Sequence, residues 1–151
     1  MISKKHFFKA LSLFLLLSLL FCACESNAPK KVSTDVIHLS AILSNEGYAT
    51  QYFEEGNGVL PSLADEMESS TGKALQGEIK GYLFVQNGST GESVMEVFVF
   101  EKPKDAQSLY NHLKDNERFV EGESECRIDY TVVYMGYISA LELIEDSALV
   151  G

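Results

Sequence analysis

The sequence contains no tryptophan, three cysteines, three histidines and three prolines among its 151 residues. Its 12 lysines and arginines are outnumbered by 22 aspartates and glutamates, so the formal net charge is −10 at pH 7. Such a surface is repelled by the phosphates of nucleic acids and by anionic lipid headgroups. We therefore expect no nucleic-acid partner. The small number of histidines and cysteines also leaves few residues from which a catalytic or metal-binding constellation could form.

The N-terminus has the features of an export signal. Lys4, Lys5 and Lys9 form a short basic region without acidic residues, and an apolar run follows from Ala10 to Phe21. This run is about a dozen residues long, whereas spanning the hydrocarbon core of a bilayer takes roughly 20 residues. The pattern therefore predicts a cleaved signal peptide rather than a permanent transmembrane helix.

The apolar run ends in Leu20-Phe21-Cys22-Ala23-Cys24. This stretch resembles the lipobox of bacterial lipoproteins, in which a cysteine receives a thioether-linked diacylglycerol and cleavage takes place just before it. The resemblance implies lipidation of Cys24, which follows the small Ala23, whereas Cys22 would follow the bulky Phe21. Phe21 and Cys22 stand where that family usually has leucine and a small residue. The alternative is an uncleaved or conventionally cleaved signal whose cysteine is incidental.

Lipidation of Cys24 would be sufficient for attachment, because two acyl chains bury enough methylene groups, at about 0.8 kcal/mol each, to hold a protein on a membrane. We therefore predict a signal peptide over residues 1–23 and a palmitate-type anchor on the extracytoplasmic face of the cell membrane. The expected partners are the membrane, through the anchor, and an envelope protein or small molecule. Removing residues 1–23 takes away three lysines and leaves 9 basic against 22 acidic residues, a net charge of −13.

The remaining chain divides into a short linker and one domain. Residues 24–34 are polar, contain Pro29 and lack apolar periodicity, which predicts a flexible tether. Residues 35–151 have the length of a single domain. Cys126 is the one cysteine that remains besides Cys24, so no intramolecular disulfide is available.

The periodicity of the apolar residues predicts both helices and strands in this domain. A spacing of three and four residues predicts helices, and β-branched and aromatic runs flanked by turn residues predict two β-hairpins. Residues 47–58 receive no assignment. The element order predicts an α+β fold with a small antiparallel β-sheet (two hairpins, about four strands) and helices packed on one face. The predicted helices are 35–45, 60–70 and one within 101–116 that begins near Pro103 and Asp105. The predicted strand pairs are 79–86 with 94–101, and 128–135 with 137–143.

The mature part is similar to small lipoproteins of Gram-positive bacteria that carry a domain of unknown function. The similarity extends over roughly residues 36–145 and lies in the stretches GYLFV, EVFVFEKPKDAQSLYNHL and YTVVYMGYISALEL. These are patterns of hydrophobicity around an alanine-containing helix. The resemblance implies a fold and a cellular location, and it implies no activity.

Three stretches of the sequence resemble known binding or catalytic motifs but lack residues that those motifs require. SSTGKAL at 69–75 is not a P-loop, because Met67 and Ala74 replace the glycine and the hydroxyl residue that would hold phosphates and magnesium. EGESE at 121–125 lacks the spacing of a calcium loop, and a solvated charge run explains it. Cys126 has no histidine and acid pattern around it that would activate the thiol. We therefore predict no cofactor, no metal ligands and no catalytic residues.

The remaining observations favour a non-catalytic binding or interaction module of the cell envelope. His38 and His112 are the two histidines outside the signal, and their spacing predicts no shared site. The alternative is a small cell-envelope hydrolase, because the chain has enough carboxylates to form a catalytic pair. A concave pocket that gathers two or more acidic, histidine or tyrosine side chains would favour the hydrolase, and a shallow aromatic groove would favour binding.

Overall fold

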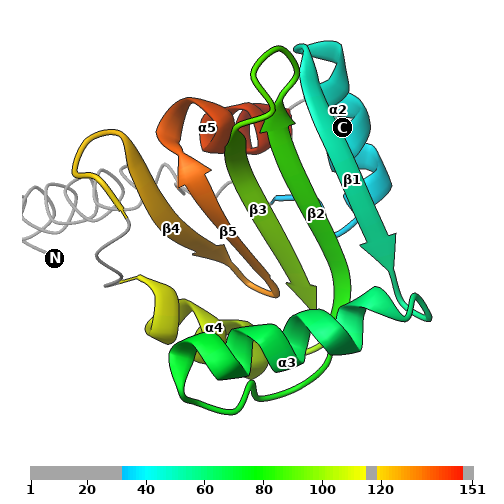
Figure 1. Cartoon of the computed structure of the whole chain (residues 1–151), viewed down its shortest axis with the longest axis vertical. Helices are drawn as coiled ribbons and strands as arrows, with labels where there is room; N and C mark the ends of the chain where they lie inside the picture. The colour runs from blue at the N-terminus through cyan, green and yellow to red at the C-terminus, as the bar shows by residue number, and fades with distance from the viewer. Residues whose placement is uncertain (1–31, 115–118, 148–151) are drawn as a thin grey trace, which may run out of the picture.

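The structure of the chain is a computed structural model that describes residues 32–114 and 119–147, with the backbone alone for Ser70, Thr71 and Ser147. These residues form four helices and five strands (Figure 1). In chain order the elements are α2 (Val36–Asn45), β1 (Tyr48–Glu54), α3 (Val59–Thr71), β2 (Ile79–Asn87), β3 (Ser93–Phe100), α4 (Pro103–Leu113), β4 (Ser124–Asp129), β5 (Val132–Tyr137) and α5 (Ile138–Ser147).

The strands form one antiparallel sheet in the order β1-β2-β3-β5-β4. The predicted α+β class with a small antiparallel sheet is therefore confirmed. The sheet has five strands where about four were predicted, because residues 48–54 add an edge strand to β2. Most residues of β1 are exposed, so this strand lacks the strong apolar alternation that identifies the others.

Helices cover both faces of the sheet, whereas the sequence predicted helices on one face only. Figure 1 shows α2 and α5 behind the sheet, and α3 and α4 in front of its lower end. The reason lies in the central strands, whose apolar side chains alternate between the two faces. In β2, Leu83 and Val85 face α2 and α5, while Tyr82 faces α3 and α4. A strand that is apolar on both faces needs a covering layer on each.

The core behind the sheet forms where α2 and α5 bury their apolar stripes. Asp35 begins α2, and its carboxylate accepts hydrogen bonds from the backbone N–H groups of Ile37 and His38. Val32, within the predicted tether, is buried in this core, and its backbone N–H donates to the carboxylate of Asp129. Among the described residues, Val32 therefore already belongs to the folded domain.

The first predicted hairpin is confirmed by β2 and β3, and so are the three predicted helices. The connection between β2 and β3 is organised by Asn87, whose side-chain oxygen accepts hydrogen bonds from the backbone N–H groups of Ser89 and Thr90. In α4, Ala106, Leu109 and Leu113 have a helical spacing and are buried against the sheet, and Tyr110 beside them is half-buried.

The second predicted hairpin is wrong in its position. The turn lies at Tyr130 and Thr131, between β4 and β5, instead of at Gly136. Tyr130 has a φ of 54°, a left-handed conformation more typical of glycine or asparagine, so the turn has no obvious signal in the sequence. The segment predicted as a last strand, residues 137–143, contributes Tyr137 to β5 and otherwise forms the first part of α5.

Candidate functional site

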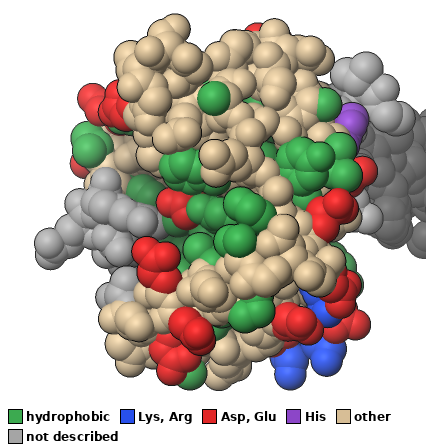
Figure 2. Space-filling model, turned by 45° about the vertical axis from the view of Figure 1, so that its right-hand side comes forward, with side chains coloured by type: hydrophobic (Ala, Val, Ile, Leu, Met, Phe, Trp, Pro, Cys, Tyr) green, Lys and Arg blue, Asp and Glu red, His purple; other side chains and the backbone are tan. Residues whose placement is uncertain are grey.

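A solvent-open cavity of about 230 Å³ lies at the upper end of β3 and β5, beside the segment that precedes β4. Figure 2 shows apolar side chains gathered around the middle of the molecule, with acidic side chains among and around them. The lysines and arginines visible on this face of the molecule lie at its lower right. The lining residues are Ser93, Val94, Met95, Glu96, Phe119, Val120, Glu123, Ser124, Met135, Gly136 and Tyr137.

Glu96 enters the cavity from the middle of the otherwise apolar β3. Its partners across the sheet are Phe84 on β2 and Met135 on β5, so its half-buried carboxylate stands among apolar side chains. The hydroxyl of Tyr82 donates a hydrogen bond of 3.0 Å to Glu96 Oε2. A hydrogen bond to a carboxylate is stronger than one between neutral groups, so the buried Tyr82 holds this carboxylate in a defined orientation.

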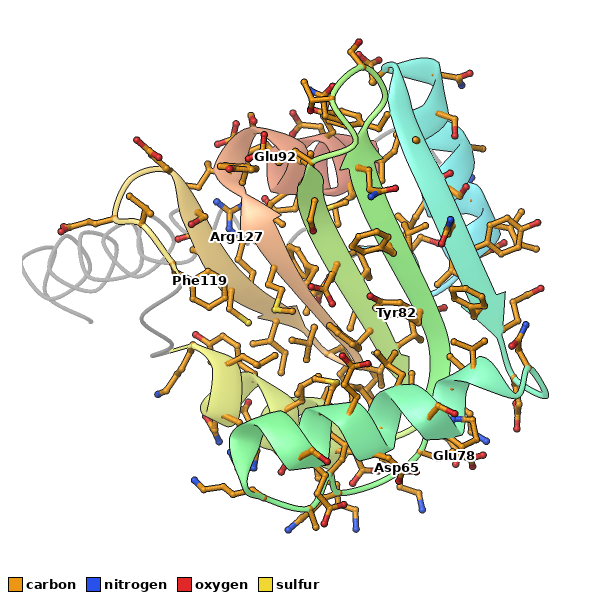
Figure 3. All side chains as sticks on the ribbon, in the orientation of Figure 1. Asp65, Glu78, Tyr82, Glu92, Phe119 and Arg127 are labelled. Atoms are coloured by element: carbon orange, nitrogen blue, oxygen red, sulfur yellow. The ribbon has the colours of Figure 1, made fainter. Side chains whose placement is uncertain are left out.

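A hydrogen-bonded turn forms the wall of the cavity opposite β3. The backbone N–H of Val120 donates to Ser124 Oγ at 2.9 Å, and the N–H of Glu123 donates to the carbonyl of Val120 at 3.0 Å. The turn is attached to the start of α5, because the N–H of Ile138 donates to the carbonyl of Glu123 at 2.9 Å. Phe119 precedes this turn and lies beside β4 (Figure 3). Its half-buried ring supplies an aromatic surface to the cavity.

The upper rim contains an additional carboxylate, on Glu92. The hydroxyl of the exposed Tyr137 donates a hydrogen bond of 3.1 Å to Glu92 Oε1. This hydrogen bond, together with the negative charge of Glu92, raises the pKa of Tyr137 above its ordinary value. The phenol therefore stays neutral over the physiological range and leaves the charge of the rim negative.

The cavity carries negative charge that no described cation compensates. None of its described lining residues is basic. Among residues 32–114 and 119–147, the ion pairs of lysine and arginine involve carboxylates outside the cavity, namely those of Glu55, Glu78, Glu125 and Glu145. The site can therefore hold a ligand that combines a positive charge with an apolar body.

A second polar cluster lies on the opposite face of the sheet, and its charged groups are already hydrogen-bonded within the cluster. Arg127 donates to Glu125 through Nε and to Glu145 Oε2 through Nη1, the latter at 2.8 Å. Glu145 Oε1 accepts a hydrogen bond from Tyr134 at 2.6 Å. Burial lowers the pKa of Arg127, but its hydrogen bonds with the two glutamates outweigh this effect and raise the pKa overall. The cluster attaches α5 to the sheet and leaves little capacity for a ligand.

The structure does not bring the residues singled out in the sequence into one site. His38 is exposed on α2 and His112 is half-buried on α4, and these helices lie on opposite faces of the sheet. Cys126 is buried. Cys24, the predicted lipidation site, lies outside the described residues. No group of three or more histidine, cysteine, aspartate or glutamate side chains within the described residues is placed to hold a metal ion.

The residues that line the cavity were not identified as a site from the sequence. The one available signal was Glu96, the single charged residue inside an apolar strand, because a charge at such a position requires a partner or a function. Glu123 appeared in the sequence as part of a solvated charge run. Phe119 belongs to a segment without periodicity, so only the tertiary structure places it beside β3 and β5.

Comparison with known proteins adds no functional information. The sequence matches no protein-family profile, and neither a curated protein nor a solved structure shows significant similarity to it. Among residues 32–114 and 119–147, no helix combines the length and the apolar character needed to cross a membrane.

Proposed function

We propose that the protein is a lipid-anchored binding module of the cell envelope, held through Cys24 on the extracytoplasmic face of the membrane and acting without catalysis. The N-terminal signal pattern supports the anchor. The observation that carries the binding function is the cavity, in which apolar walls surround the oriented carboxylate of Glu96. Apolar walls with a few positioned polar groups are typical of ligand sites.

The position of the tether supports binding on the side away from the membrane. The backbone N–H of Val32 donates a hydrogen bond to Asp129, next to the turn between β4 and β5. The cavity lies near Tyr137, at the other end of β5. The six residues of β5 separate these two ends by about 17 Å. Seven residues lie between Cys24 and Val32, so the eight Cα–Cα steps reach at most about 28 Å when extended. The anchor would thus hold the domain near the bilayer with its cavity open to the envelope.

Site-specific photo-cross-linking in intact cells tests this function. A photoreactive benzoylphenylalanine replaces Val120, an exposed residue at the cavity, in the full chain. The control carries the same group at Ile37, which has a similar exposed fraction of 44% but lies on α2, behind the sheet. We expect a discrete adduct from position 120 and none from position 37. Adducts at both positions, or at neither, would contradict a specific binding site.

A hydrolase is a second candidate, because Glu96 and Glu123 line the same cavity together with Tyr137. Hydrolysis of a glycosidic bond uses two carboxylates, one of which is protonated in an apolar environment. Glu123 is exposed rather than enclosed by apolar side chains, and Glu96 already accepts a hydrogen bond from Tyr82. Assays of the full chain on chromogenic glycosides and esters test this alternative. Turnover that is lost in both Glu96→Gln and Glu123→Gln would replace the binding function with catalysis.

A further inference from the structure

The size of the cavity limits what can occupy it. A drug-sized ligand fills a pocket of about 300–1,000 Å³, and this cavity has a volume of about 230 Å³. It opens to solvent at the surface of the domain, so part of a larger molecule can enter it while the rest of that molecule stays outside. One side chain of a bound protein fits these limits better than a complete cofactor or lipid.

The lining defines the chemistry of that side chain. Glu96 and Glu123 contribute two carboxylates, and the described lining contributes no positive charge. Phe119 adds an aromatic ring, whose face attracts a cation. The apolar side chain of Met135, which packs in front of the sheet, favours a side chain with an aliphatic stem. A cation with an apolar stem is therefore complementary to the cavity in both charge and polarity.

Arginine fits this lining better than lysine. Its planar guanidinium stacks on an aromatic ring while its five N–H donors reach more than one carboxylate, whereas a lysine ammonium is a compact and strongly hydrated charge. Glu96 is suited to this role because Tyr82 fixes its Oε2 atom and leaves Oε1 available to a ligand. Neither Glu96 nor Glu123 forms an ion pair with a described lysine or arginine.

We propose that this cavity receives an arginine side chain from a basic surface of a protein partner in the extracytoplasmic space. The proposal rests on the function proposed above and names the chemistry of its ligand. A protein is favoured over a lipid surface because the cavity lies at the end of β5 opposite the tether, and the net charge of −13 repels anionic headgroups. The same charge attracts a basic protein and accelerates its association at low ionic strength.

Methionine-methyl NMR of the full chain in an uncharged detergent tests the proposal. Met135 lines the cavity in front of the sheet and serves as the reporter, whereas Met67 on α3 does not line it and serves as an internal reference. The probes are N-acetyl-arginine methylamide, its lysine and glutamine analogues, and N-acetyl-phenylalanine methylamide. We expect the arginine probe to shift Met135 with a Kd on the order of 1 mM. The lysine probe should bind more weakly, and the glutamine probe should produce no shift.

Variants then test which groups recognise the cation. Glu96→Gln keeps an acceptor for Tyr82 and removes the charge, so we expect it to weaken arginine binding by about fivefold or more. Glu142→Gln changes the net charge equally on an exposed position of α5, behind the sheet, and should leave binding unchanged. Phe119→Leu keeps an apolar side chain and should weaken the arginine probe more than the lysine probe. Raising NaCl from about 0.05 M to about 0.5 M should weaken binding in the parent chain.

The probes separate failure of this inference from failure of the proposed function. Binding of the phenylalanine probe at Met135 without binding of the arginine probe overturns the cationic ligand but keeps a binding cavity. Equal binding of the arginine and glutamine probes, or equal losses in Glu96→Gln and Glu142→Gln, also overturns the proposal. If no probe shifts Met135 and no adduct forms at Val120, both the inference and the binding function fail. If free agmatine binds more tightly than the arginine probe, the ligand is a small amine and the protein partner is wrong.

Discussion

The hydroxyl of Tyr134 lies 2.6 Å from Glu145 Oε1 and donates a hydrogen bond to it, joining β5 to α5. The other oxygen of this carboxylate accepts from Arg127 at 2.8 Å. Tyr134 is buried in the core behind the sheet. Burial raises the pKa of Tyr134 well above its ordinary value, and the hydrogen bond to Glu145 raises it further. The folded protein therefore favours the neutral phenol.

This relationship predicts how stability depends on alkaline pH. The folded state retains the Tyr134 proton at pH values where the unfolded state loses it, above about pH 10. The stabilisation of the folded state that comes from the raised pKa of Tyr134 is complete below pH 10, and it is lost as the pH rises above that value. Tyr134→Phe should cost about 1–2 kcal/mol of unfolding free energy at pH 7, because it removes a hydrogen bond to a charged group. Its unfolding free energy should then fall less between pH 10 and pH 11 than that of the parent chain.

Tyr137→Phe is the control for the cost at pH 7 alone, because the pKa of Tyr137 is also raised. Tyr137 is 38% exposed and donates to Glu92, so its loss should change the unfolding free energy at pH 7 by no more than about 0.5 kcal/mol. Urea melts at pH 7, 10 and 11 measure both effects. Parallel pH dependence in Tyr134→Phe and the parent chain would show that Tyr134 does not retain its proton in the folded state.

Gly77 and Asp105 make a second testable contact, between the loop before β2 and the first turn of α4. A Cβ atom at Gly77 would lie 2.3 Å from the carboxyl carbon of Asp105, which is itself buried. Gly77 also has a φ of 83°. Gly77→Ala should therefore add a steric cost of about 1–3 kcal/mol to the cost of placing alanine in a left-handed conformation, about 1–2 kcal/mol.

Gly91→Ala separates these two costs. Gly91 has a similar φ of 72° in the connection between β2 and β3, and nothing lies within 4 Å of the added methyl group. It should show the conformational cost alone in a denaturant melt. Equal losses of unfolding free energy in the two variants would mean that α4 moves away from Gly77 without resistance.

The reliable sequence predictions in the fold came from periodicity within one element. Leu109 and Leu113 are spaced for one face of a helix, and α4 buries both. The second hairpin was misplaced because its turn depends on Tyr130, a residue type that gives no warning of a positive φ. In α5, Ala140, Leu141 and Ile144 have a helical spacing, but the preceding β-branched and aromatic residues favoured a strand.

The candidate site was less predictable because three separate segments contribute to it. Glu96 comes from β3, Tyr137 from the end of β5, and Phe119 and Glu123 from the segment before β4. Their meeting depends on the pairing of β3 with β5, a contact between two hairpins that no local pattern specifies. Local sequence could identify Glu96 as unusual, but it could not supply the residues around it.

The beginning of the folded domain can be tested by truncation. Val32 is buried, and its N–H donates to Asp129, so a fragment of residues 32–151 should unfold cooperatively in urea. A fragment of residues 35–151 loses this contact, and it should be less stable by about 1.5–3 kcal/mol because a buried valine is removed. If both fragments have the same midpoint and slope, Val32 contributes nothing and the domain begins at α2.

The membrane anchor leads to a prediction that depends on one atom, the sulfur of Cys24. Cys24→Ala removes the thiol that would carry diacylglycerol, so the chain should no longer incorporate a clickable palmitate in growing cells. A retained signal would still keep some of this variant with membranes, so lipid label, rather than fractionation alone, is the decisive measurement. Cys22→Ala is the matched control, because it removes a thiol two positions away within the predicted signal and should leave labelling intact. Loss of label in both variants, or in neither, would contradict Cys24 as the anchor.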